Sequence, residues 1–161
     1  MRIVSDTSPI TSLAAIDQLE LLHQLYDTVI IPQAVYEEMT EAGNVPGAIE
    51  VQTLSWIQKQ QVQNREQAIT LRTQLNRGES EAIVLAMEIN ADLLILDEKP
   101  GRIIALQYGL KIIGVLGVLL EAKQKNLIRT VKPLIDELID RANFRVNAQL
   151  YTNILGIAGE Q

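Results

Sequence analysis

The chain has 161 residues, with 20 acidic and 14 basic side chains, a net charge of −6 and no cysteine. This length fits one domain that buries its own core. The lack of cysteine excludes disulfide scaffolds, thiolate catalysis, zinc fingers and iron–sulfur clusters, and it agrees with a cytoplasmic location. No apolar run approaches the roughly 18 residues of a membrane helix, and the first residues do not resemble an export signal, so we expect no membrane association.

Charge is unevenly distributed along the chain. Residues 1–98 carry five basic and fifteen acidic side chains, whereas residues 99–132 carry seven basic side chains against Glu121 alone. The net negative charge argues against a protein that holds nucleic acid by bulk electrostatics. An acidic body with one basic segment is compatible with a metal site beside a phosphate-binding surface, although a solvated helix face explains any single lysine equally well.

The predicted elements alternate between strands and helices. The strands are short β-branched or apolar runs, at residues 3–4, 27–31, 56–62, 93–96 and 111–113. The helices have apolar residues at three- and four-residue spacing, at residues 8–26 with a break near Asp17, 33–40, 63–75, 79–89, 100–108, 115–125, 131–141 and 148–157. This alternation predicts an α/β fold with a mainly parallel sheet and helices on both faces. We expect one domain over residues 1–161, with a core at 1–129 and a helical extension at 130–161.

Acidic residues end two of these strands and lie near the starts of two helices. Asp6 and Asp97 follow strands, and the carboxyl ends of parallel strands meet at one edge of a sheet. The helix-borne acids are Glu37, Glu38, Glu79 and Glu81. Gathered carboxylates repel one another unless a cation is present, and oxygen-only ligands suit Mg²⁺ or Mn²⁺. For each acid alone, a turn, a helix cap or a complement to the helix dipole is an equally good interpretation.

Other kinds of site lack their sequence signals. The only histidine, His23, lies inside a predicted helix with no pattern of a catalytic triad around it. The chain contains neither a dinucleotide fingerprint nor a P-loop, and aromatic residues are too sparse for a platform on which bases stack.

Four stretches together resemble PIN-domain nucleases, and within them the DUF3368 family of bacterial and archaeal proteins related to VapC-type toxins. They are IVSDTSPITSLAAI, VIIPQAVYEEM, LNRGESEAIVLAMEINADLLILDEKPGR and VKPLIDELIDRANFRVNAQLYTNILGIAGE. They cover nearly the whole chain in the expected order, and the last is the most family-specific. The resemblance implies a three-layer α/β/α sandwich plus C-terminal helices, and three or four acids that bind Mg²⁺ or Mn²⁺ for RNA hydrolysis.

The resemblance also implies which acids form the site. It places them at Asp6, Glu38, Glu81 and Asp97, with Asp6, Glu81 and Asp97 as the metal ligands. Glu79 is an alternative to Glu81, because both belong to the stretch GESEA. Glu37 is adjacent to Glu38 and points about 100° away on a helix, so only one of the pair should face the site.

Further residues have predicted roles in binding the substrate. Ser8 occupies a position where many relatives have a polar residue that steadies the first acid, and Arg102 and Lys99 of the basic segment are expected to engage phosphate. The chain departs from the common pattern in having Glu where many PIN nucleases have Asp at the third position, and in reading Asp97-Glu98-Lys99 after the fourth-acid strand.

The ordered acids favour a metal-dependent hydrolase, and the resemblance implies an endoribonuclease, the toxin of a toxin–antitoxin system, with RNA as substrate and a small antitoxin protein as partner; we also expect a homodimer. The alternative is a catalytically weak or inactive PIN-like scaffold that binds a protein or RNA without cleaving it. A receiver-like phosphoacceptor is a third interpretation, but Lys111 begins its predicted strand, whereas that fold needs a lysine at a strand end.

Overall fold

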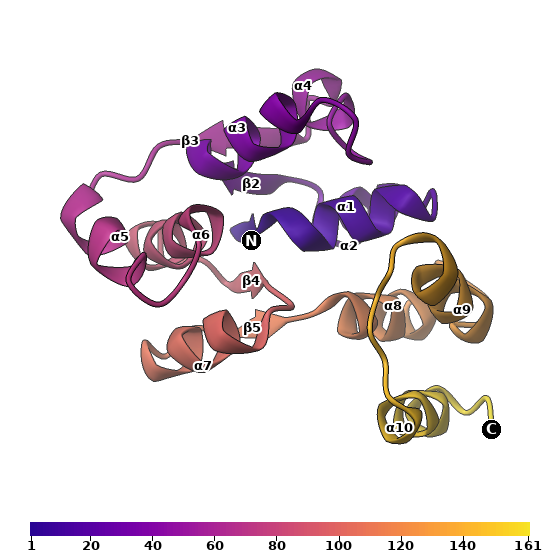
Figure 1. The fold of residues 1–161 in the computed structure, drawn as a ribbon. Helices are drawn as coiled ribbons and strands as arrows, with labels where there is room; N and C mark the ends of the chain where they lie inside the picture. Colours follow the sequence, from indigo (N-terminus) through magenta and orange to yellow (C-terminus); the bar gives the residue numbers. More distant parts are fainter.

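The computed structural model describes residues 1–161 and contains five strands and ten helices (Figure 1). The strands are β1 (Ile3–Ser5), β2 (Val29–Pro32), β3 (Ile57–Gln60), β4 (Leu93–Ile95) and β5 (Ile112–Ile113). The helices are α1 (Thr7–Ala15), α2 (Glu20–Tyr26), α3 (Gln33–Ala42), α4 (Glu50–Thr53), α5 (Arg65–Leu71), α6 (Arg77–Glu88), α7 (Lys99–Gln107), α8 (Val115–Gln124), α9 (Lys132–Arg141) and α10 (Ala148–Ala158).

The five strands form one sheet in the order β3-β2-β1-β4-β5, and every pairing is parallel. The first strand is therefore the central one. Val4 pairs with Ile30 on one side and with Leu94 on the other, so Asp6 and Asp97 follow the ends of neighbouring strands. All strands being parallel, their carboxyl ends share one edge of the sheet, which is where open α/β folds bind ligands.

Side chains of alternate strand residues enter two separate hydrophobic cores. Ile3 and Ile95 belong to the larger core, which includes residues of α1, α2, α8, α9 and α10. Val4 and Leu94 belong to the smaller core, formed with α5, α6 and α7. Figure 1 shows α5 and α6 to the left of the strands and α1, α2 and α8 to the right. This arrangement confirms the predicted α/β/α sandwich.

Most predicted elements are present, with differences at their ends. The helical pattern of residues 8–26 breaks as expected, because Asp17 has a φ of 58° between α1 and α2. The weakly patterned segment 56–62 contains the edge strand β3. The predicted helix at 63–75 is realised only as α5, and the one-turn helix α4 was not predicted, because short helices carry too few apolar repeats to be recognised.

The C-terminal helices cover part of the larger core. Val131, Ile135 and Leu138 are completely buried there, and Ile154 and Leu155 of α10 are nearly so. Burial of these side chains contributes roughly 1.5–3 kcal/mol for each large aliphatic group. None of the helices combines the length and the apolar character that crossing a membrane requires.

Candidate metal-binding active site

Asp6 lies at the carboxyl end of the central strand, where β1 turns directly into α1. Its backbone is extended and occupies the N-cap position, yet its side chain makes no capping hydrogen bond. Only 3% of the residue is exposed, and Oδ1 has no hydrogen-bond partner. Buried carboxylates normally find partners, so this group is not explained by a capping role.

Glu38 also approaches this end of the central strand. It lies on α3, the helix that follows the neighbouring strand β2. Its Oε2 accepts a hydrogen bond of 2.9 Å from Oγ1 of Thr7. A Cβ atom on Gly78 would lie 2.7 Å from this oxygen and 3.4 Å from Oδ1 of Asp6. The two carboxylates therefore converge on the start of α6, and they do so because Gly78 has no side chain.

Glu79, the next residue of α6, raises the pKa of Asp6 more than any other charge does. It is 5% exposed, and Oε2 is buried without a hydrogen-bond partner. Its backbone N–H donates to Oδ1 of Asn76, the N-cap residue of α6, over 2.8 Å. This cap fixes the first turn of the helix and with it the direction of the Glu79 side chain.

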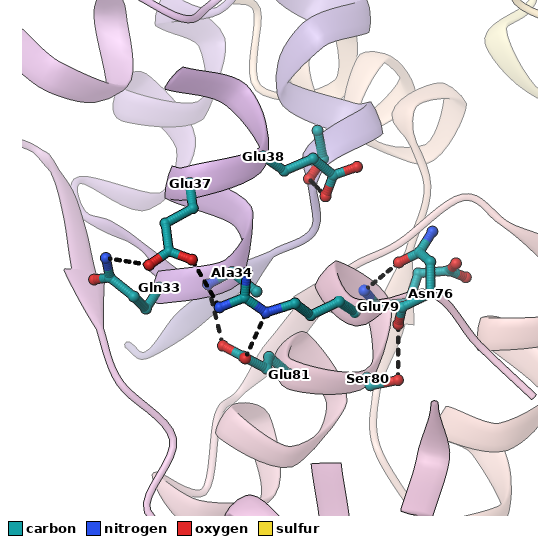
Figure 2. Close-up of polar contacts among 10 residues, drawn as sticks. Gln33, Ala34, Glu37, Glu38, Asn76, Glu79, Ser80 and Glu81 are labelled. Carbon is teal, nitrogen blue, oxygen red and sulfur yellow. Dashed lines mark hydrogen bonds and ion pairs between the residues drawn. The ribbon is translucent and has the colours of Figure 1, made fainter. Parts of the chain in front are cut away.

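Glu81 points to a different side of α6 and contacts α3 (Figure 2). Its Oε1 accepts a hydrogen bond of 3.1 Å from the backbone N–H of Ala34, and its Oε2 lies 3.6 Å from Nε of Arg77. Glu37 lies on this side as well, 2.7 Å from Nη2 of Arg77. Of the two acids left open by the sequence, Glu79 therefore accompanies Asp6 and Glu38, whereas Glu81 and Glu37 are engaged by Arg77.

Asp97 follows β4 and is held by the start of α8. Its Oδ1 accepts a hydrogen bond of 3.1 Å from the backbone N–H of Val115, while Oδ2 is buried without a partner. Arg102 lies beside it and donates from Nη1 to the backbone oxygen of Leu96 over 3.1 Å. Burial raises the pKa of Asp97 to about 6, although the Val115 amide and Arg102 lower it.

Glu98 links the acids electrostatically and was not assigned a role from the sequence. Its charge contributes to raising the pKa values of Asp6, Glu79 and Asp97. For Asp6 the main cause is burial, to which the charges of Glu79, Glu38 and Glu98 add, so its pKa rises to about 7. Burial also raises the pKa of Glu79. The doublet Asp97-Glu98 after the strand was the sequence signal for this further acid.

Two adjoining clefts open beside the acids. A cleft of about 450 Å³ is lined by Asp6, Glu38 and Glu98, and a larger one of about 850 Å³ by Asp97, Lys99 and Arg102. They share lining residues, namely Ser8, Thr11, Ser12, Glu98, Ala142 and Asn143. Oγ of Ser8 is buried without a hydrogen-bond partner. The predicted substrate residues Ser8, Lys99 and Arg102 thus all line a cleft that continues from the acids.

The acids offer the oxygen ligands that a divalent cation prefers, but their side chains are not arranged around one point. No three Asp, Glu or His side chains are arranged so that they could hold a metal ion as they stand. However, Asp6, Glu79 and Asp97 each bury a carboxylate oxygen that lacks any partner. Uncompensated buried carboxylates are costly, and hard cations such as Mg²⁺ and Mn²⁺ prefer oxygen ligands of this kind. The donor set is therefore suited to such an ion.

Comparison with known proteins agrees with this architecture. No curated protein matches the sequence closely enough to be identified as a relative. The family DUF3368, described as a PIN domain, matches residues 2–160, which is nearly the whole chain. Because this match spans the sheet, all the acids above and both C-terminal helices, the chain belongs to the DUF3368 family of PIN domains.

Proposed function

We propose that this PIN domain is a Mg²⁺- or Mn²⁺-dependent endoribonuclease that hydrolyses phosphodiester bonds of RNA. PIN domains are generally nucleases, so the family supports the reaction class. The observation that carries the proposal is the buried carboxylate of Asp6, whose Oδ1 has no partner, beside the carboxylate of Glu38 and under the charge of Glu79, at the carboxyl edge of a parallel sheet.

In this proposal Asp6, Glu38 and Glu79 would hold the ion. Glu79 takes the position that the sequence left open between it and Glu81. Asp97 remains the fourth acid, since Val115 anchors Oδ1 and leaves Oδ2 free. Glu98 is exposed and directly precedes α7. Its negative charge favours a cation at this site.

When bound, a divalent ion would supply Lewis-acid stabilisation of the phosphoryl oxygen and would favour ionisation of an attacking water. The residues of the chain do the rest. Thr7 fixes the carboxylate of Glu38, and in the metal-free site the pKa of Asp6 is raised to about 7, so Asp6 would release a proton when the ion binds near neutral pH. Arg102 and Lys99 line the adjoining cleft, where they would bind phosphates that flank the scissile bond.

The test combines metal binding with RNA cleavage. We expect saturable Mn²⁺ binding and Mn²⁺-dependent cleavage of single-stranded RNA, both lost in Asp6→Asn. Glu81→Gln is the matched control, because it removes an acid from the same helix on the side that faces Arg77. Cleavage that survives Asp6→Asn combined with Asp97→Asn would show that the acids are not the catalytic centre.

A scaffold function without cleavage is the second candidate, and one observation favours it: no three acidic side chains are already arranged to hold an ion. A scaffold would show no Mn²⁺ affinity at millimolar concentration and unchanged RNA binding in Asp6→Asn. The same metal titration therefore separates the two candidates before any RNA substrate is known.

The biological role that we propose is that of a toxin in the cytoplasm, restrained by a small antitoxin protein and acting as a homodimer. This role rests on the resemblance to VapC-type toxins. Expression of the chain should arrest growth in a way that depends on Asp6, and the product of a small neighbouring gene should relieve the arrest. Sedimentation equilibrium measures whether the chain dimerises.

A further inference from the structure

Apart from the two clefts beside the acids, a further pocket lies at the carboxyl edge of the sheet, beside the ends of β2 and β3. It has a volume of about 310 Å³ and is bordered by Gln33, the first residue after β2, and by Gln61, the first residue after β3. Three arginines, Arg65, Arg72 and Arg77, line it as well. Glu37 and Glu81 line the same pocket, so its charged lining is three basic against two acidic side chains, in a chain with a net charge of −6.

Two of the three arginines are available to a ligand. Arg77 contacts Glu37 and Glu81, which also line the pocket. Arg65 and Arg72 are exposed and form no ion pair. They are seven positions apart, about two helical turns from the start of α5 to its C-cap, so they lie on the same face roughly 10 Å apart along the helix axis.

The remaining wall of the pocket combines amide and apolar side chains. Ile69 of α5 is 60% exposed, and Val62 and Ala68 line the pocket as well. Gln61 is exposed and offers both a donor and an acceptor. Guanidinium groups next to an apolar surface and amides suit a nucleotide, which has a phosphate, a flat base and polar base edges.

Residues of α3 and α6 line both this pocket and the surroundings of the acids, and Figure 2 shows the neighbouring side chains of Glu37 and Glu38 leaving α3 in different directions. On α3, Glu38 lines the cleft of the acids, whereas the preceding residue Glu37 lines the arginine pocket. On α6, Gly78 adjoins Asp6 and Glu38, whereas Arg77 lines the pocket. Strands β1 and β3 are two positions apart in the sheet, which is roughly 10 Å. Nearby nucleotides of one RNA strand can therefore occupy the two sites.

We propose that the arginine pocket, formed by Arg65, Arg72 and Arg77 with Gln61 and Ile69, is a subsite that binds the phosphate of single-stranded RNA extending from the acid cluster. The inference rests on the proposed ribonuclease function for the identity of the strand. Arg65 and Arg72 bind phosphate oxygens through their guanidinium forks, Ile69 supports a base, and Arg77 stays fixed by Glu37 as part of the wall.

The test measures binding of a 2′-O-methyl RNA of about ten nucleotides, which covers a typical single-strand site and resists cleavage. EDTA is present, so neither metal nor activity contributes. We expect Arg65→Gln combined with Arg72→Gln to weaken binding roughly tenfold at low salt. Because the two contacts release counterions, the slope of log K against log salt should shrink by about 1.4. Side-chain amide signals of Gln33 and Gln61 should shift in NMR spectra when RNA is added.

The matched control is Lys111→Gln combined with Arg129→Gln, which removes the same charge from two exposed positions outside this pocket. Equal loss of binding in both double variants would overturn the proposal, because it would indicate general attraction. A polyglutamate peptide that binds with the same dependence on Arg65 and Arg72 would also overturn it, in favour of an acidic protein segment. Failure of RNA cleavage in the wild type would count against the ribonuclease proposal alone, since this assay needs no cleavage.

Discussion

Gly78 and Glu38 approach so closely that a Cβ atom on Gly78 would lie 2.7 Å from Oε2 of Glu38. The same point lies 3.4 Å from Oδ1 of Asp6, which is an ordinary contact. A glycine inside the first turn of a helix weakens the helix relative to alanine. The chain thus accepts a cost in helix stability where two carboxylates converge.

Gly78→Ala should separate stability from metal binding. The added methyl group improves helix propensity by up to about 1 kcal/mol, but it displaces the flexible end of Glu38. We therefore expect an unchanged or slightly higher melting temperature together with clearly weaker Mn²⁺ binding, measured by calorimetry. Gly156→Ala in α10, whose Cβ would meet only the end of Gln161, controls for helix propensity. Undiminished Mn²⁺ affinity in Gly78→Ala would contradict a role for Glu38.

Glu79→Gln and Glu81→Gln should have opposite effects on stability in the absence of metal. Glutamine at position 79 removes a buried carboxylate whose pKa is raised by burial, so the free energy of unfolding should rise. Glutamine at position 81 weakens the contacts with Ala34 and Arg77, so the free energy of unfolding should fall by about 0.5–1 kcal/mol. Urea unfolding measures both changes, and equal signs would contradict this assignment of the two acids.

The sequence predicted which edge of the sheet carries the acids, because two of them each directly follow a predicted strand. Asp6 and Asp97 directly follow apolar runs, and parallel pairing of β1 with β4 brings such ends together regardless of loop details. The α/β/α layers followed for a similar reason, since continuous apolar strands such as 93–96 must be covered on both faces. Long, regular patterns thus predicted both the fold class and the edge that carries the acids.

The choice between Glu79 and Glu81 did not follow from the sequence. Residues two apart on a helix point roughly 200° apart, so the outcome depends on which helix face meets Asp6. That face is set by the Asn76 cap, which starts α6 at Arg77, two residues before the predicted start. The partners of Glu81 include the backbone of Ala34, a contact between distant segments that no local pattern contains. The role of Glu98 depends on tertiary position in the same way.

Asp97→Ala and Asp97→Asn should differ in stability. The carboxylate accepts the backbone N–H of Val115, the first residue of α8, and alanine leaves that group without its partner. We expect Asp97→Ala to lower the free energy of unfolding by about 1–2 kcal/mol. Asparagine keeps an acceptor and should remain close to the wild type near pH 4, whereas above pH 6 it should be the more stable protein, because it removes a carboxylate whose pKa is raised to about 6. If Asp97 also acts in the reaction, both variants should lose RNA cleavage, and retention of cleavage by Asp97→Asn would restrict Asp97 to a structural role.

The stability of the metal-free protein should fall as pH rises, because of Asp6. Its pKa is about 7 in the folded chain against an ordinary value of 3.8, so the folded state retains a proton that the unfolded state has already lost. The contribution to stability is complete below pH 4 and is lost as pH rises through 7, and it amounts to about 2–4 kcal/mol. Asp97, with its pKa raised to about 6, acts in the same direction.

Asp6→Asn removes this titration and therefore isolates it. The difference in free energy of unfolding between Asp6→Asn and the wild type should be small near pH 4 and should favour the variant by about 2–4 kcal/mol at pH 8. Glu41→Gln, which changes an exposed acid at the end of α3, should show no such trend. Saturating Mn²⁺ should restore the stability of the wild type at pH 8, but should leave Asp6→Asn unchanged. A difference between the two proteins that is independent of pH would show that Asp6 is ionised in the folded protein throughout this range.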